Sequence, residues 1–461
     1  MTVDCVIVDS HIITPKGMIE RNIVIEDGKI LDFTTDIPQC DKKINAKGLV
    51  AIPGLIDTHV HYGVYSPIDE AATTESRAAA LGGVTTMMRM LRLGRSYRRY
   101  LKDQLSASAK SHYVDYAIHA TIFNEKQADE MAYCVENGVP SFKIYLNLGG
   151  EVGHVFMDMD PGATELFEAQ VQIEGATIDK VMANASRLGC PVLIHAEDYQ
   201  MCECGIKKAK NGKKDGLPAW SESRPTDSEV KSIKKVSEIA RQHGTTIYFV
   251  HIGSAAALYA INEERKKGTK IFVETCPHYL TLSYENQKGY LAKVMPPIRS
   301  SEDVKQVWGA ISGGRIQTIG TDHVANRLKL KVGDDVWSSL AGFPGIGTLL
   351  PLLLSEGVNK NRLNLGQLVE LTSLNASKIF GMYPQKGVIQ KGSDADITLI
   401  DLKLERKVSA ESFGAFSDYI VYEGWSLKGW PITTLVRGSV VVEDMQVVGK
   451  IGHGVLVKRS V

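Results

Sequence analysis

Two histidines placed two residues apart are the first side chains in this chain whose types and spacing could do chemistry together. His59 and His61 belong to the motif Asp57-Thr58-His59-Val60-His61, which closes an apolar run over residues 49–56 that predicts a short buried strand. Side chains i and i+2 of a strand lie on the same side, so both imidazoles can reach one metal ion. Alone, the pair is equally compatible with two structural histidines.

Four more polar residues stand in or at the end of other short apolar runs: Lys143, His195, His251 and Asp322. Imidazole and carboxylate suit zinc, manganese or iron at neutral pH. A lysine ammonium cannot bind a cation, but its neutral amine can add carbon dioxide to give a carbamate that bridges two cations. Each residue has a structural alternative, such as a helix cap for Asp322. Six of them at strand ends together predict a two-metal site.

Two cations in one site predict a hydrolytic reaction. Ions about 3.5–4 Å apart can share a bridging hydroxide, polarise a carbonyl oxygen and lower the pKa of bound water toward about 7. Asp322 would accept the proton of the nucleophile and give it to the leaving nitrogen. The predicted chemistry is hydrolysis of an amide or a related carbonyl group.

The elements that must position these residues alternate between strands and helices. Eight apolar strand candidates lie near residues 54–60, 84–90, 115–122, 141–146, 191–196, 246–251, 271–275 and 316–321. Segments with helical spacing of apolar residues, such as 178–188 and 230–242, separate them. This order predicts an α/β fold, a (β/α)8 TIM barrel whose strand ends share the face where active sites form.

Both chain ends have β character. Short β-branched runs occur at residues 6–8, 12–14 and 22–25, and again at 397–400, 432–436 and 440–442. Each end is too short to stand alone, so we expect them to pair as one small β-sandwich. The predicted domains are therefore residues 1–52 plus 385–461 for the β-sandwich, and 53–384 for the metal-dependent catalytic barrel.

Composition excludes several classes of partner. Lys+Arg and Asp+Glu are equal at 53 each, so the net field does not favour nucleic acid or an anionic membrane. Apolar stretches fall short of a membrane span, and the N-terminus lacks signal-peptide features. Seven scattered cysteines, an odd number, predict reduced thiols and a cytoplasmic location. Cys202 and Cys204 lack a second pair, so we interpret them as incidental thiols rather than a metal site.

The motifs resemble the amidohydrolase superfamily, specifically its cyclic amidohydrolase branch of hydantoinases, dihydropyrimidinases, allantoinases and dihydroorotases. The resemblance extends nearly from end to end. It is carried by Gly54-Leu55-Ile56-Asp57-Thr58-His59-Val60-His61, Ser141-Phe142-Lys143, Ile194-His195-Ala196-Glu197, Glu274-Thr275-Cys276-Pro277-His278-Tyr279-Leu280, Lys293-Val294-Met295-Pro296-Pro297-Ile298-Arg299, Gly320-Thr321-Asp322-His323, Asn375-Ala376-Ser377-Lys378-Ile379-Phe380-Gly381 and Lys391-Gly392-Ser393-Asp394-Ala395-Asp396.

This resemblance implies a binuclear centre. His59, His61 and Asp322 would bind one divalent ion, His195 and His251 the other, and N6-carboxylated Lys143 would bridge both. Zinc is the expected metal, and a homo-oligomer, tetramer or dimer, is the expected assembly. The branch also contains non-catalytic scaffolding relatives that have lost ligands, but all six positions are intact here.

Departures from the family pattern bear on the substrate. Tyr62-Gly63 follows the histidine pair where dihydroorotases carry an arginine for the substrate carboxylate, and Leu148 stands where D-type hydantoinases carry an oxyanion-binding tyrosine. Tyr145 points to the same side of its strand as Lys143, so it is a substitute for that tyrosine or a packing residue. Met295 resembles the apolar substrate contact of L-type hydantoinases.

Two further features have open interpretations. The segment 89–99 holds five arginines, of which Arg89 and Arg92 are candidates for binding an acidic substrate; a solvated helix start or a subunit contact is the alternative. His278 either orients a metal ligand from behind or hydrogen-bonds within the barrel. The loop motif Ser223-Arg224-Pro225 is interpreted as structural.

The function predicted from the sequence is a binuclear metal-dependent hydrolase of the hydantoinase/dihydropyrimidinase type. A metal-bridging hydroxide would open a small cyclic amide or imide ring. The alternatives are an allantoinase, a hydrolase of an acidic cyclic amide such as dihydroorotate, or a non-catalytic scaffold.

Overall fold

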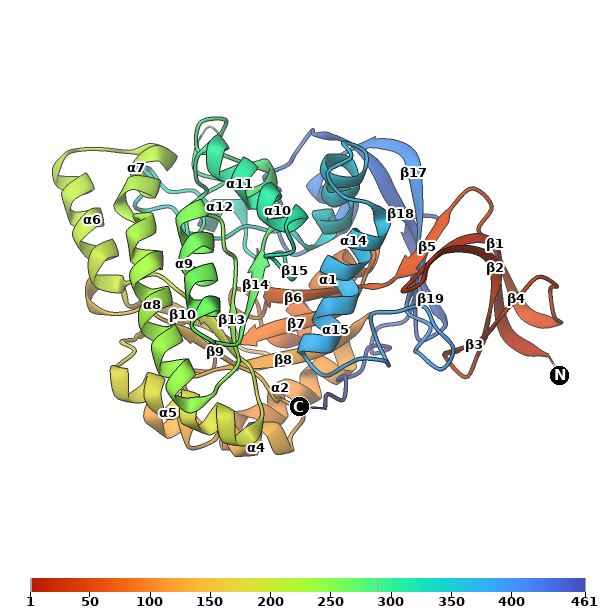
Figure 1. Cartoon of the computed structure of the whole chain (residues 1–461), viewed down its shortest axis with the longest axis horizontal. Coiled ribbons are helices and arrows are strands. Elements are labelled where there is room, and N and C mark those ends of the chain that lie inside the picture. Colours follow the sequence, from red (N-terminus) through yellow and green to blue (C-terminus); the bar gives the residue numbers. More distant parts are fainter. Residues whose placement is uncertain (1, 288, 461) are drawn as a thin grey trace.

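The chain folds into a barrel with a second sheet built from both termini. The structure, a computed structural model, describes residues 2–287 and 289–460. A parallel sheet makes the barrel, a mixed sheet joins the two ends of the chain, and a two-stranded hairpin stands apart from both. In Figure 1 the first four strands project to one side of the barrel. Within the described residues, no helix has the length and apolar character needed to span a bilayer.

Eight positions around the barrel are filled by parallel strands. They are β6 (Leu55–His61), β7 (Val84–Leu91), β8 (Asp115–Thr121), β9 (Phe142–Tyr145), β12 (Val192–His195), β13 (Ile247–Phe249), β14 (Ile271–Thr275) and the short pair β15 (Thr318–Ile319) and β16 (His323–Val324). β15 pairs with β14, and β16 pairs with β6, so the two halves of an interrupted eighth strand close the ring. The predicted (β/α)8 barrel is confirmed.

Helices follow the strands and cover the outside of the barrel. The main ones are α1 (Ile68–Leu81), α2 (Tyr97–Ser111), α5 (Gly175–Leu188), α8 (Thr226–His243), α9 (Ala255–Lys266) and α11 (Ser301–Ser312). In α5 the buried residues Ile178, Val181, Met182 and Ala185 repeat with helical spacing, which turns one apolar face toward the sheet. The two helices predicted over 178–188 and 230–242 are both present and begin a few residues earlier.

Shorter elements fill the loops at the two ends of the barrel. Helical segments are α3 (Glu125–Ala128), α4 (Met131–Glu136), α6 (Tyr199–Asn211), α7 (Gly216–Ser223), α10 (Pro277–Thr281), α12 (Leu328–Lys331), α13 (Leu349–Leu352), α14 (Leu365–Val369) and α15 (Asn375–Ile379), with single turns η1 (Gly150–Val152), η2 (Ile346–Thr348), η3 (Leu353–Val358), η4 (Glu370–Leu374) and η5 (Ala410–Phe413). The hairpin β10 (His154–Met157) and β11 (Phe167–Gln170) follows β9. The sequence patterns did not predict this hairpin.

The terminal sheet joins strands from both ends of the chain. It contains β1 (Val3–Thr14), β2 (Gly17–Glu26), β3 (Lys29–Thr34), β4 (Cys40–Asn45), β5 (Val50–Pro53), β17 (Ile397–Lys407), β18 (Ser426–Val436), β19 (Ser439–Glu443) and β20 (Gln446–Val447). Antiparallel pairing of β17 with β5 connects the two ends, and Ile7, Ile23, Ile397 and Leu435 share its buried core. The predicted β domain from both termini is confirmed, and its assigned boundaries stay a prediction.

The apolar run over residues 49–56 is two strands rather than the single strand predicted. β5 belongs to the terminal sheet, and β6 begins the barrel two residues later. Gly54 makes the crossing, and a Cβ on this residue would lie 2.2 Å from side-chain atoms of Thr85. A glycine is therefore required where the chain passes from one sheet into the other.

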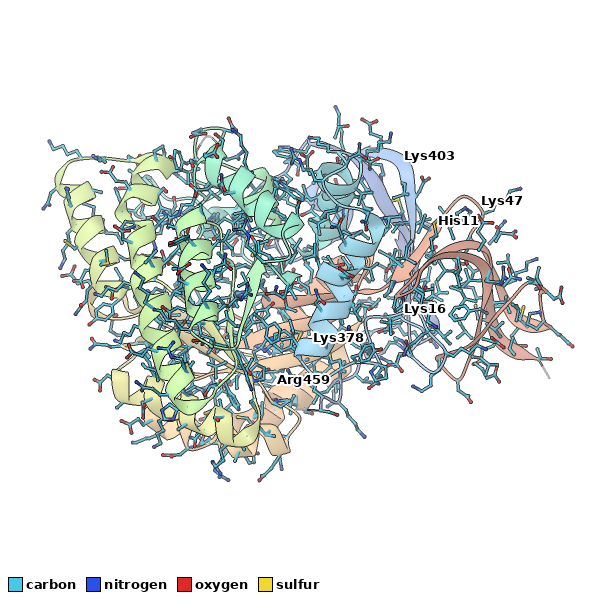
Figure 2. The ribbon with its side chains drawn as sticks, in the orientation of Figure 1. His11, Lys16, Lys47, Lys378, Lys403 and Arg459 are labelled. Atoms are coloured by element: carbon cyan, nitrogen blue, oxygen red, sulfur yellow. The ribbon has the colours of Figure 1, made fainter. Side chains whose placement is uncertain are left out.

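The C-terminal tail lies against the barrel end opposite the strand carboxyl ends. Arg459, labelled in Figure 2, donates hydrogen bonds to Ser141 Oγ at 2.7 Å and to the Ile118 carbonyl at 2.6 Å. These contacts fix the last residues to the starts of the central strands. The carboxyl ends of the strands remain free for a site.

Candidate metal centre and active site

Three predicted ligands converge on one point at the end of β6. Nε2 of His59 lies 3.2 Å from Nε2 of His61, and each of these nitrogens lies 3.2 Å from Oδ1 of Asp322. Tetrahedral ligand atoms about 2.0–2.2 Å from one ion lie a little more than 3 Å apart. The triangle therefore fits a single divalent cation. All three side chains are buried.

The backbone is strained where two of the candidate ligands stand. Asp322 has a φ of 51° in the gap between β15 and β16, and His251, just after β13, has a φ of 45°. Non-glycine residues rarely adopt this left-handed conformation, which costs about 1–3 kcal/mol where it is imposed. Both residues follow the end of a barrel strand, where the left-handed conformation turns the side chain toward the inside of the barrel.

Lys143 lies beside this cluster on β9 and is fully buried. Within the described residues its Nζ has no hydrogen-bond partner, and it lies 4.9 Å from the centre of the Tyr145 ring. Burial, only partly offset by Asp322 and Glu274, lowers the pKa of Lys143 to about 7. A large fraction of the amine is therefore neutral near pH 7. The neutral amine is the form that adds carbon dioxide.

The remaining two histidines form a second group next to the first. The rings of His195 and His251 are 4.6 Å apart, and His251 lies 5.3 Å from His59. Burial lowers the pKa of all three histidines, so the imidazoles are neutral, the form that binds cations. The structure thus brings all six predicted ligands together at one end of the barrel.

Glu274 at the end of β14 contacts two candidate ligands, and the sequence analysis gave it no role. Its Oε1 lies 2.8 Å from His59 Nδ1 and accepts the His251 backbone N–H at 3.3 Å. Its Oε2 accepts hydrogen bonds from Thr58 at 2.6 Å and Tyr248 at 2.8 Å. A carboxylate behind a ligating histidine fixes the ring and its tautomer. Glu274 therefore orients His59.

His195 has its own buried carboxylate. Its Nε2 lies 2.6 Å from Glu197 Oε2, and Glu197 accepts hydrogen bonds from Arg224 Nε at 2.9 Å and Nη2 at 2.6 Å. Burial alone would raise the pKa of Glu197, but Arg224 and His195 outweigh it and hold the pKa at about 2. The loop motif interpreted as structural thus supplies the cation that keeps this carboxylate ionised.

A small cavity of about 110 Å³ opens onto the ligand cluster. Its wall consists of His61, Tyr65, Arg92, Tyr145, Asn147, Leu148, His154, Val155, His195, His251, Val294, Met295, Asp322, Val324, Ala341 and Gly342. The predicted substrate contacts Tyr145, Met295 and Arg92 are among these residues. Drug-sized ligands occupy cavities of about 300 Å³ or more, so this one suits a small molecule.

Comparison with known proteins identifies the family. Residues 50–441 match the model of the amidohydrolase family. The chain belongs to the amidohydrolase family. Among its relatives, an allantoinase of Solibacter usitatus is 29% identical over 98% of this chain and 96% of its own. A D-hydantoinase of Geobacillus stearothermophilus is 29% identical over 97% and 95%, and an L-hydantoinase of Paenarthrobacter aurescens is 28% identical over 99% and 98%.

Solved structures agree with this assignment. A crystal structure of a D-hydantoinase superposes with a TM-score of 0.89 at 29% identity, over 100% of this chain and 99% of its own. The L-hydantoinase (dihydropyrimidinase) of Arthrobacter aurescens gives 0.90 at 27% identity, over 99% and 100%. This amidohydrolase is therefore an enzyme of the hydantoinase and allantoinase group.

The arginine-rich segment of this amidohydrolase divides between the predicted alternatives: Arg92 lines the cavity, whereas Arg98 and Arg99 are exposed in the first turn of α2. Arg89 is fully buried in β7 and donates to the Tyr62 carbonyl, Gln104 Oε1 and Asp158 Oδ2, so it does not reach the cavity. Arg95 pairs with Asp160 through two hydrogen bonds. These two arginines anchor the loop after β10 instead of forming a solvated helix start. The prediction of substrate binding by Arg89 is withdrawn.

His278 lies in α10 close to the amidohydrolase site and packs against two aromatic rings. Its ring centre lies 4.2 Å from that of Tyr279 and 5.2 Å from that of Phe343. In the described part of the chain its Nε2 has no hydrogen-bond partner. An orienting role for His278 stays a prediction.

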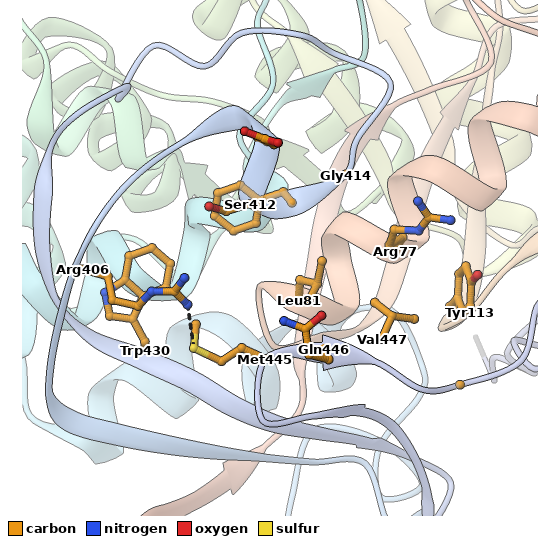
Figure 3. Close-up of a pocket in the computed structure, with 13 residues that line it drawn as sticks. Arg77, Leu81, Tyr113, Arg406, Ser412, Gly414, Trp430, Met445, Gln446 and Val447 are labelled. Atoms are coloured by element: carbon orange, nitrogen blue, oxygen red, sulfur yellow. Dashed lines mark hydrogen bonds between the residues drawn. The ribbon is translucent and has the colours of Figure 1, made fainter.

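A larger cavity, about 520 Å³, lies between α1 and the terminal sheet (Figure 3). Arg77 and Leu81 line it from α1, and Arg406 and Trp430 line it from β17 and β18. An Arg406 nitrogen lies 2.7 Å from the Met445 sulfur, the contact drawn in Figure 3. The residues described around this cavity include none of the candidate ligands. The site of this amidohydrolase is therefore assigned to the smaller cavity.

Proposed function

We propose that this chain is a hydrolase that depends on two divalent cations and opens a small cyclic amide or imide ring, as a hydantoinase or dihydropyrimidinase does. His59, His61 and Asp322 would hold one cation, and His195 and His251 the other. Carboxylated Lys143 would bridge them, and zinc is the proposed metal. The observation that carries the proposal is the 3.2 Å triangle beside a buried lysine amine that has no hydrogen-bond partner among the described residues.

The chain's own residues have distinct tasks in this reaction. Bound cations would supply Lewis acidity that polarises the substrate carbonyl and acidifies water. Asp322, through Oδ2, the carboxylate oxygen outside the ligand triangle, would take the proton of the attacking water and release it to the leaving ring nitrogen, which gives an open-chain acid. Glu274 and Glu197 hold the His59 and His195 rings in place. The lining around buried Tyr145 and half-buried Met295 would limit access of bulk water and orient the ring.

Tyr145 is the proposed donor to the oxygen of the reacting carbonyl. Its hydroxyl is buried, lines the cavity, and has no hydrogen-bond partner among the residues described. Leu148 and Met295 lie in the same wall and provide apolar contact for the ring. His278 is proposed to support Asp322, whose pKa it lowers against the larger effect of burial.

Allantoin is a second candidate substrate. The relative named allantoinase is 29% identical over 98% of this chain, which equals the identity of the D-hydantoinase relative. Both rings are small cyclic amides and would use the same residues. We also propose a homo-oligomer, a tetramer or dimer, as the assembly.

The decisive experiment is ring opening by the zinc-loaded, bicarbonate-treated protein. The panel contains hydantoin, 5-substituted hydantoins of both hands, dihydrouracil, allantoin and dihydroorotate, with metal content measured in parallel. Activity on hydantoins or dihydrouracil that disappears in Asp322→Asn supports the proposal. Activity on allantoin alone selects the second candidate. A protein that binds fewer than two ions and opens none of these rings contradicts it.

A further inference from the structure

The wall of the active-site cavity contains one fixed positive charge beside the candidate ligands. Among the described residues that line this cavity, Arg92 is the single arginine or lysine. Its side chain is 14% exposed. Its Nε is buried and has no hydrogen-bond partner in the described part of the chain. A buried guanidinium without a full set of acceptors is a strong receptor for an anion.

The nearest carboxylate pairs with this charge only at long range. Asp158 Oδ2 accepts hydrogen bonds from Arg89 Nη2 at 2.9 Å and from the Arg92 backbone N–H at 3.2 Å. The Arg92 Nε lies 3.9 Å from Asp158 Oδ1, beyond hydrogen-bond distance. Two guanidinium groups thus share one carboxylate, and Arg89 holds the better geometry. The positive charge of Arg92 is therefore only partly compensated by Asp158, and it faces the cavity.

Other acidic groups near the cavity are engaged elsewhere. Asp322 belongs to the ligand triangle, and Glu168 pairs at 2.7 Å with His154, which lines the cavity. A substrate with its own negative charge would supply the missing partner.

We infer that Arg92 selects cyclic amides that carry a carboxylate substituent, and that it binds this carboxylate while the ring lies over the ligand cluster. The inference rests on the proposed ring-opening function and specifies its substrate class. Arg92 is a specificity-determining residue here, because the carboxylate it binds does not take part in bond cleavage. Leu148, Val294 and Met295 give the wall an apolar part that fits the body of the ring.

The test compares two rings of nearly equal shape and different charge, hydantoin-5-acetic acid and hydantoin-5-acetamide. In the holoenzyme the acid should have the higher kcat/KM by roughly tenfold or more, because a hydrogen-bonded charge pair is lost with the amide. Arg92→Gln should reduce the acid-to-amide ratio at least tenfold, mainly through KM of the acid. Arg92→Lys should retain part of the ratio. Added salt should lower the ratio in the wild type.

Arg95→Gln is the matched control, because it removes an equal charge from the same segment. Arg95 pairs with Asp160 and does not line the described cavity wall. This substitution should leave the ratio unchanged. Equal preference for both rings in the wild type, or a ratio that survives Arg92→Gln, overturns the inference while ring opening stands. If neither of these two rings is opened, calorimetric binding of both decides the inference by the same criteria, and the proposed function fails only if the full panel of rings is not opened either.

Discussion

Glu274→Gln separates the charge of the carboxylate behind His59 from its shape. Glutamine is isosteric and can keep the hydrogen bonds. Its carbonyl oxygen can replace Oε1, which faces His59 Nδ1 at 2.8 Å and accepts the His251 N–H at 3.3 Å. Its amide nitrogen can donate to the hydroxyl oxygens of Thr58 and Tyr248, which face Oε2 at 2.6 and 2.8 Å. Burial raises the pKa of Glu274 to about 8 in the metal-free chain, and bound cations would favour the ionised carboxylate. In the metal-loaded protein the substitution therefore removes a negative charge and little else.

The expected effect is on metal affinity. A hydrogen bond to an ionised acceptor is roughly twice as strong as a neutral one, so His59 becomes a weaker ligand by about 1 kcal/mol. Loss of the attraction between the carboxylate and the cation adds a similar amount. Together these effects weaken metal binding by about 1.5–3 kcal/mol. The dissociation constant for the metal should therefore rise 10- to 100-fold, which is the range found for partners of ligating histidines. Stability of the metal-free protein should change little.

The assay is competition for zinc with a chromogenic chelator at fixed pH, combined with urea unfolding of the metal-free protein. Glu264→Gln is the control, since Glu264 is an equally buried carboxylate that pairs with Arg241 and Lys267 on the barrel surface. Metal affinity of Glu274→Gln within about twofold of wild type would refute the orienting role. Equal weakening in Glu264→Gln would assign the effect to the fold rather than to the site.

Three other substitutions test the rest of the site. Lys143→Met removes the amine that would carry the bridging carboxylate, so bound metal should fall below two ions per chain and kcat by roughly 100-fold or more; unchanged metal stoichiometry would contradict the bridge. Tyr145→Phe should lower kcat by about 100-fold if the hydroxyl donates to the carbonyl oxygen, whereas wild-type kcat would assign the ring to packing. Arg224→Met leaves Glu197 buried without its partner and should destabilise the protein by about 3–5 kcal/mol in urea unfolding; a loss under about 1 kcal/mol would contradict that pairing.

The sequence was sufficient for those parts of the fold that follow from local patterns. Eight apolar runs predicted eight barrel strands, and the i, i+2 spacing of His59 and His61 placed two imidazoles on one side of a strand. Lys143, His195, His251 and Asp322 followed from the rule that barrel strands present their carboxyl ends on one face. These inferences need only neighbouring residues and the parallel order of the strands.

The groups that support the ligands required the three-dimensional structure. Glu274 meets His59 across 215 residues of sequence, and no spacing rule connects them. Arg89 and Arg92 stand three residues apart in one basic segment, yet Arg89 is neutralised by Asp158 and Arg92 faces the cavity. Which arginine meets the carboxylate depends on the loop after β10, whose hairpin has no clear pattern in the sequence.

The unfavourable features of this barrel are concentrated around one point. His251 and Asp322 adopt left-handed backbone conformations, and Lys143 and Tyr145 bury polar atoms that have no partner among the described residues. Each such feature costs about 1–3 kcal/mol, and none adds to the packing of the core. Ordinary packing would favour apolar side chains at these positions. A bound cation pair and a reacting ring would give each of these groups a partner, which is the physical reason to interpret the strained cluster as a working site rather than as a remnant in a scaffold.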